Sequence, residues 1–155
     1  GDLSTPDQVI EQWEEIKKKE KNQINQSSIL DSIPKNLPSL IRAQKLQKKA
    51  AKEGFDWEKI SDVFKKLDEE VSEFKEAVLN KKNNEIESEV GDILFTLVNI
   101  AKFVKVDAEE ALRSSINKFS KRFQFIEQEI KKNGRTLKES SLEEMEHYWQ
   151  KAKSQ

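Results

Sequence analysis

The sequence contains no cysteine and very little glycine, proline or histidine. Its 155 residues include four glycines, three prolines and one histidine. The absence of cysteine excludes disulfide bonds, thiolate nucleophiles and thiolate metal ligands. A ferritin-like di-iron centre is disfavoured, because the half-motif Glu144-x-x-His147 would need a second histidine. With so few helix-breaking residues, the composition favours amphipathic helices.

The sequence also lacks an excess of either charge and any long apolar run. It carries 28 lysines and arginines against 29 aspartates and glutamates, and the two signs are interleaved. No overall field would therefore attract nucleic acid or anionic lipid. The longest apolar stretch, Ile93–Val104, is interrupted by three polar residues, and no segment is typical of a signal peptide. We expect a cytoplasmic protein with no membrane or nucleic-acid partner.

Large apolar residues recur every three or four positions through most of the chain, which predicts helices rather than strands or disorder. We expect an N-terminal helix over residues 1–21, a connecting segment over residues 22–38 and one domain over residues 39–155. The fold class is all-α, an antiparallel helical bundle. The helix that contains Ile86–Val104 is apolar almost all round, so it should be central and buried.

Four carboxylates lie where helical spacing can bring them together. Glu70 and Glu73 are one turn apart, and so are Glu89 and Asp92 on the most apolar helix. Burying several carboxylates is costly, so they should be exposed, protonated, paired with bases or neutralised by a cation. In the last case, an all-oxygen ligand set favours Mg²⁺, an ion that shares its coordination shell with substrate phosphates.

Basic and aromatic residues that could face a phosphate lie on the last two helices. Lys118 and Arg122 are one turn apart, and Lys153 is one turn beyond Trp149. Each feature alone has an ordinary explanation. In a chain so rich in Glu and Lys, an E-E-x-x-E motif is usually a solvated helix face. By the same reasoning, isolated basic residues are usually surface charges and a tryptophan usually belongs to the core.

Taken together, these residues and the stretches around them resemble the C-terminal half of MazG, a nucleoside triphosphate pyrophosphohydrolase of the all-α superfamily. The resemblance covers nearly everything from Trp13 onward. It is carried by WEEIK at Trp13–Lys17, LPSLIRAQKLQKKAAKEGFDW at Leu37–Trp57, EEVSE at Glu69–Glu73, EVGDILFTLVNIAKF at Glu89–Phe103 and NKFSKRF at Asn117–Phe123. The chain departs from the family at Glu85, where members often carry a basic residue one turn before the E-x-x-D glutamate.

The resemblance implies a MazG-like four-helix core completed by dimerisation, and it assigns roles to individual residues. Mg²⁺, with Mn²⁺ as a substitute, would be bound by Glu70, Glu73, Glu89 and Asp92. The candidates for the catalytic base are Glu69 and Glu70. Contacts to the nucleotide and its phosphates would come from Lys118, Arg122, Trp149 and Lys153, with Asn99 as a further candidate.

The function implied by the resemblance is Mg²⁺-dependent hydrolysis of a nucleoside triphosphate to the monophosphate and pyrophosphate. Water would be the nucleophile, while Lys118 and Arg122 would offset charge on the leaving pyrophosphate. Two alternatives stay open. One is a phosphoribosyl-ATP or dUTP pyrophosphohydrolase of the same superfamily, and the other is a non-catalytic helical interaction module whose acidic residues are only solvated.

Overall fold

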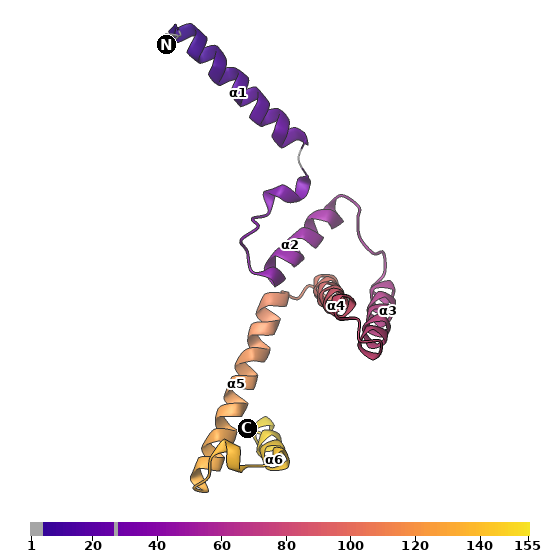
Figure 1. Cartoon of the computed structure of the whole chain (residues 1–155), viewed down its shortest axis with the longest axis vertical. Helices are drawn as coiled ribbons and strands as arrows, with labels where there is room; N and C mark the ends of the chain where they lie inside the picture. Colours follow the sequence, from indigo (N-terminus) through magenta and orange to yellow (C-terminus); the bar gives the residue numbers. More distant parts are fainter. Residues whose placement is uncertain (1–4, 27) are drawn as a thin grey trace. The chain divides into compact units, whose positions relative to one another are not determined.

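The computed structural model describes residues 5–26 and 28–155, and every element in this part of the chain is helical (Figure 1). The α-helices are α1 (Pro6–Gln26), α2 (Ser39–Lys52), α3 (Ile60–Leu79), α4 (Asn83–Phe103), α5 (Ala108–Lys132) and α6 (Leu142–Lys153), and the 3₁₀ helices are η1 (Ile29–Ser32) and η2 (Leu137–Glu139). The predicted all-α class is confirmed. None of these described helices has an apolar stretch of sufficient length to span a bilayer.

The chain divides into two compact units, Gly1–Trp57 and Glu58–Gln155. The first unit contains α1, η1 and α2, and the second contains α3 to α6. Every residue predicted to bind metal or nucleotide lies in the second unit, so the site can be described within that unit alone. The division into domains at residues 21 and 38 stays a prediction, whereas the structure gives the ends of the helices themselves.

The N-terminal helix is longer than the sequence predicts. α1 continues to Gln26 instead of ending at about Lys21. Residues 22–26 contain neither glycine nor proline, so nothing in their backbone chemistry stops the helix. Ser28 then opens η1 through a capping box with Asp31. The segment expected to connect the first two helices is therefore shorter than predicted and partly helical.

α3 and α4 pack together as a helical hairpin (Figure 1). Residues 80–82 join the two helices, and Lys81 adopts the left-handed backbone region there, with φ at 52°. So short a connection makes the helices antiparallel neighbours. The buried apolar residues of the pair are Val63, Ala77 and Val98. The pairing brings the middle of α3 beside the middle of α4, where the predicted carboxylates lie.

α4 is less buried than the sequence predicts. Thr96 and Val98 are the buried residues of this helix, whereas Leu94 and Leu97 remain 51% and 45% exposed. The reason is that a hairpin partner covers one side of a helix and leaves the other sides open. The expectation that this helix is central and buried is therefore wrong for the single chain.

α5 and α6 form a second hairpin. Asp107 caps the start of α5 and Ser141 caps the start of α6, and each side chain accepts a hydrogen bond from the backbone N–H three residues later. Gly134, with φ at 71°, follows the end of α5 in the conformation that favours glycine. Arg135 forms an ion pair with Glu144, which ties α6 to the end of α5. The buried apolar residues of this hairpin are Ile126 and Ile130.

Candidate metal and nucleotide site

Three of the four predicted metal ligands meet between α3 and α4. One carboxylate oxygen from each of Glu70, Glu73 and Glu89 lies within 4.8 Å of the others. Glu70 is buried with 4% exposure, Glu89 is half-buried and Glu73 is exposed. The one-turn spacing of Glu70 and Glu73 puts both on the side of α3 that faces α4. Two helices thus direct three negative groups to one point.

Glu70 and Glu89 differ in how readily their carboxyl groups ionise. The ammonium of Lys66 lies 2.7 Å from Glu70 Oε1. This interaction, followed in importance by that with Glu89, holds the pKa of the Glu70 carboxyl below its ordinary value. The adjacent Glu70 carboxylate, aided by burial, raises the pKa of Glu89 to about 7. Sequence reasoning missed Lys66, although its position one turn before Glu70 is a visible signal.

Two oxygens of the group have no hydrogen-bond donor. Glu70 Oε2 and Glu89 Oε2 are buried, and no described residue donates to them. Leaving a buried acceptor unsatisfied costs about 1–3 kcal/mol, and more when the group is charged. A cation placed among these oxygens would satisfy both and would offset the mutual repulsion of the carboxylates. Because all the atoms that would coordinate the metal are carboxylate oxygens, the residues present fit a hard divalent metal ion.

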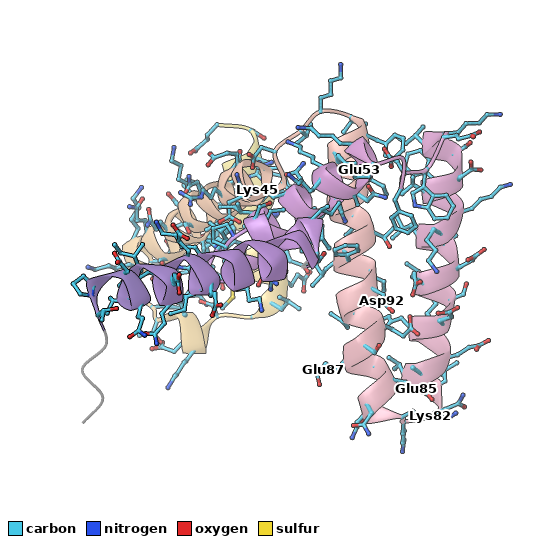
Figure 2. All side chains as sticks on the ribbon, turned by 90° about the horizontal axis from the view of Figure 1, so that it is seen from above. Lys45, Glu53, Lys82, Glu85, Glu87 and Asp92 are labelled. Carbon is cyan, nitrogen blue, oxygen red and sulfur yellow. The ribbon has the colours of Figure 1, made fainter. Side chains whose placement is uncertain are left out.

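Asp92, the fourth predicted ligand, does not belong to this close group. It lies one turn after Glu89 on α4 (Figure 2), and it is an exposed residue. Its backbone carbonyl accepts a hydrogen bond from the Thr96 hydroxyl at 2.8 Å. Glu69, a candidate for the catalytic base, is exposed on α3. The roles of Asp92 as a ligand and of Glu69 as a base stay predictions.

Three of the predicted phosphate contacts gather in one groove. Lys118 and Arg122 of α5 and Lys153 of α6 line a groove of about 300 Å³. The Arg122 guanidinium carbon also lies 5.4 Å from the centre of the Trp149 ring, so the fourth predicted contact is attached to the same cluster. Lys121 lines the groove too and was not predicted, although its spacing from Lys118 places it on the same side of α5. None of the grouped carboxylates lines this groove.

Two further positions on α4 bear on the site. The side-chain oxygen of Asn99 is buried and accepts no hydrogen bond from the described residues, which leaves it free for a ligand. Glu85 is exposed, and its carboxylate lies 3.6 Å from the ammonium of Lys82 at the start of α4 (Figure 2). A basic group is therefore present beside Glu85 even though that position itself is acidic.

Part of the second unit matches a known protein family. Residues 58–125 match the model of the MazG nucleotide pyrophosphohydrolase domain. This region is similar to the MazG domain. The match includes α3, α4, the three grouped carboxylates, Lys118 and Arg122, while Trp149 and Lys153 follow it in the sequence. The resemblance to MazG is thereby confirmed.

Individual relatives extend the match over most of the chain. The chain is 41% identical over 149 residues to the nucleoside triphosphate pyrophosphohydrolase/pyrophosphatase MazG of Thermotoga maritima, and 40% identical over 152 residues to the nucleoside triphosphate pyrophosphohydrolase of Escherichia coli K12. Each alignment covers 96% of this chain and 57% of the relative, so the chain spans little more than half the length of these MazG proteins. It is also 48% identical over 146 residues to the uncharacterized protein YabN of Bacillus subtilis, of which it covers 30%.

In the metal-free protein, we expect the carboxyl group of Glu89 to titrate at a pH of about 7 instead of its ordinary 4.5. A raised pKa means that the folded state binds this proton more tightly than the unfolded chain. The stabilisation from Glu89 is therefore present below pH 4.5 and is lost as the pH rises through about 7. The pKa of Glu70 is lowered, so the stabilisation from Glu70 is present above pH 4.5 and is lost as the pH falls below that value.

Carbon-13 NMR titration of the glutamate carboxyl groups measures these midpoints directly. The substitution Glu70→Gln should move the Glu89 midpoint down towards 4.5, because it removes the facing negative charge. The control Glu76→Gln, which changes an exposed residue of the same helix, should leave the midpoint unchanged. A Glu89 midpoint near 4.5 in the unmodified protein would contradict this account of the charges.

Proposed function

We propose that this chain carries the catalytic domain of a Mg²⁺-dependent nucleoside triphosphate pyrophosphohydrolase, which releases a nucleoside monophosphate and pyrophosphate. The observation that carries the proposal is the meeting of Glu70, Glu73 and Glu89 within 4.8 Å, with buried oxygens that lack donors. The site lies in the region that matches the MazG domain, and two relatives are named for this activity. In line with the composition, we place the activity in the cytoplasm, without a nucleic-acid partner.

In this proposal, Glu70, Glu73 and Glu89 would hold the metal ion, with Asp92, one turn after Glu89, as a fourth ligand. When bound, Mg²⁺, or Mn²⁺ in its place, supplies a Lewis acid that polarises phosphoryl oxygens and reduces their negative charge. Water attacks one phosphorus of the anhydride between the first and second phosphates, and the bridging bond breaks. Glu69 and Glu70 are the candidates to accept the proton of that water.

The α5–α6 groove supplies the complementary positive charge. Lys118, Arg122 and Lys153 would stabilise the charge that develops on the leaving pyrophosphate. Trp149 offers an aromatic face to the base, and Arg122 already flanks that ring. The unpaired oxygen of Asn99 would accept a hydrogen bond from a hydroxyl or amino group of the nucleoside. The α3–α4 hairpin would thus bind the metal ion, and the α5–α6 hairpin would bind the anionic substrate.

Incubation of the protein with Mg²⁺ and a panel of triphosphates, followed by separation of the products, tests the reaction. We expect monophosphate and pyrophosphate in equal amounts. Glu70→Gln should lower kcat at least about 100-fold, because it removes a charged ligand from the centre of the metal group. Glu76→Gln, an exposed residue on the same helix, should retain the activity of the unmodified protein.

The same assay separates the competing explanations. Release of a nucleoside diphosphate and orthophosphate, or full activity of the Glu70→Gln variant, would contradict the proposal. Turnover restricted to phosphoribosyl-ATP or dUTP would favour a different member of the superfamily. A helical interaction module would show no turnover, and Mg²⁺ would not raise its melting temperature, because only a cation that prefers the folded state stabilises it.

We also propose that the chain functions as a homodimer whose interface covers the apolar faces of α4 and α5. The exposed apolar residues on these faces are Val90, Leu94 and Leu97 on α4, and Leu112, Ile116 and Phe119 on α5, each between 40% and 58% exposed. Their three-and-four spacing makes one stripe on each helix. Gly91 supports the proposal, because a mid-helix glycine costs about 0.5–1 kcal/mol relative to alanine. Apart from its chain neighbours and the backbone of its own helix, no described atom lies within 4 Å of the position that a Cβ at Gly91 would take.

Sedimentation equilibrium should give the unmodified protein a mass of twice 18.1 kDa. Leu94→Glu places a charge in the apolar stripe and should shift the protein to monomer while preserving its helical content. Glu87→Lys alters an exposed polar position of the same helix and should leave the dimer intact. A monomeric mass for the unmodified protein, or a dimer unaffected by Leu94→Glu, would contradict the proposed interface.

A further inference from the structure

Lys66 is the basic residue that contacts the buried member of the carboxylate group. Its ammonium lies 2.7 Å from Glu70 Oε1, and its side chain is 42% exposed while that of Glu70 is 5% exposed. One end of the ion pair is therefore held inside the α3–α4 interface, and the other end reaches solvent. The pair therefore extends from solvent to the buried carboxylate at the centre of the proposed metal site.

Local helix energetics favour this ion pair only weakly. Lys66 precedes Glu70 by four residues, and a lysine before a glutamate at this spacing is the less favourable order in a helix. Surface pairs of this kind contribute little to stability. The burial of Glu70 makes this pair different, because a buried carboxylate without a cation nearby is strongly destabilising. Lys66 therefore supplies the positive charge that the interface needs when no metal ion is bound.

A divalent ion among Glu70, Glu73 and Glu89 would need the same oxygens and would repel the ammonium. We propose that Lys66 is an internal counter-cation that competes with the metal ion for Glu70 and is displaced towards solvent when the ion enters. This inference rests on the proposed metal site. The Lys66 side chain is 42% exposed, so the ammonium can move into solvent without unfolding of α3. Lys66 would thus set the metal affinity and keep the metal-free site folded.

Isothermal titration calorimetry with Mn²⁺, in the absence of nucleotide, tests the competition. Lys66→Met should bind Mn²⁺ about fivefold more tightly than the unmodified protein, because the competing charge is gone. Its melting temperature without metal should be lower, and the rise on adding Mn²⁺ should be larger. Lys65→Met is the matched control: it removes the neighbouring, exposed lysine, which has no ion-pair partner among the described residues, and should behave like the unmodified protein.

The outcomes are distinguishable. If the unmodified protein binds no Mn²⁺, the proposed metal site fails, and the inference about Lys66 fails with it. If Mn²⁺ binds but Lys66→Met shows the affinity of Lys65→Met, or a weaker one, the competition is overturned and the metal site stands. If Lys66→Met does not fold without metal, Lys66→Gln, which removes the charge but can still donate to Glu70, replaces it. Unchanged affinity in that variant would equally overturn the inference.

Discussion

The burial of Glu70 between α3 and α4 is the constraint on which the rest of the site depends. A carboxylate with 4% exposure cannot rely on water, so neighbouring groups must offset its charge. Lys66 does so in part at 2.7 Å, and the pKa of Glu89 rises to about 7 beside it. One buried oxygen on each of Glu70 and Glu89 still lacks a donor. The interface is therefore arranged to accept more positive charge than the chain itself supplies.

The two hairpins of the second unit carry opposite charges. The α3–α4 hairpin gathers Glu70, Glu73 and Glu89, whereas the α5–α6 hairpin gathers Lys118, Arg122, Lys121 and Lys153 along one groove. A metal ion with a triphosphate presents both signs, and each hairpin suits one of them. Under the proposed function, this division would let a chain with a net charge of −1 bind an anionic substrate without a strong overall field.

The sequence predicted most of this arrangement, because helical spacing determines which residues share a side of a helix. It placed Glu70 with Glu73 and Lys118 with Arg122. Spacing does not determine the side-chain conformation of Asp92, which lies outside the close group. An apolar helix surface also does not show whether the same chain or another molecule covers it. The burial of α4 within the single chain was therefore overestimated. Lys66 was overlooked because lysine–glutamate pairs are common on solvated helices. The sequence does not show that Glu70 is buried, and that burial is what makes the charge of Lys66 important.

Anomalous X-ray scattering from crystals grown with Mn²⁺ and a slowly hydrolysed triphosphate analogue tests the central claim most directly. Mn²⁺ scatters anomalously at accessible wavelengths, so its position does not depend on interpretation of the surrounding density. The account predicts a peak at about 2 Å from oxygens of Glu70, Glu73 and Glu89, with a second contact to the phosphates of the analogue. A bound analogue with no peak at these three carboxylates, or with a peak elsewhere on the chain, would contradict it.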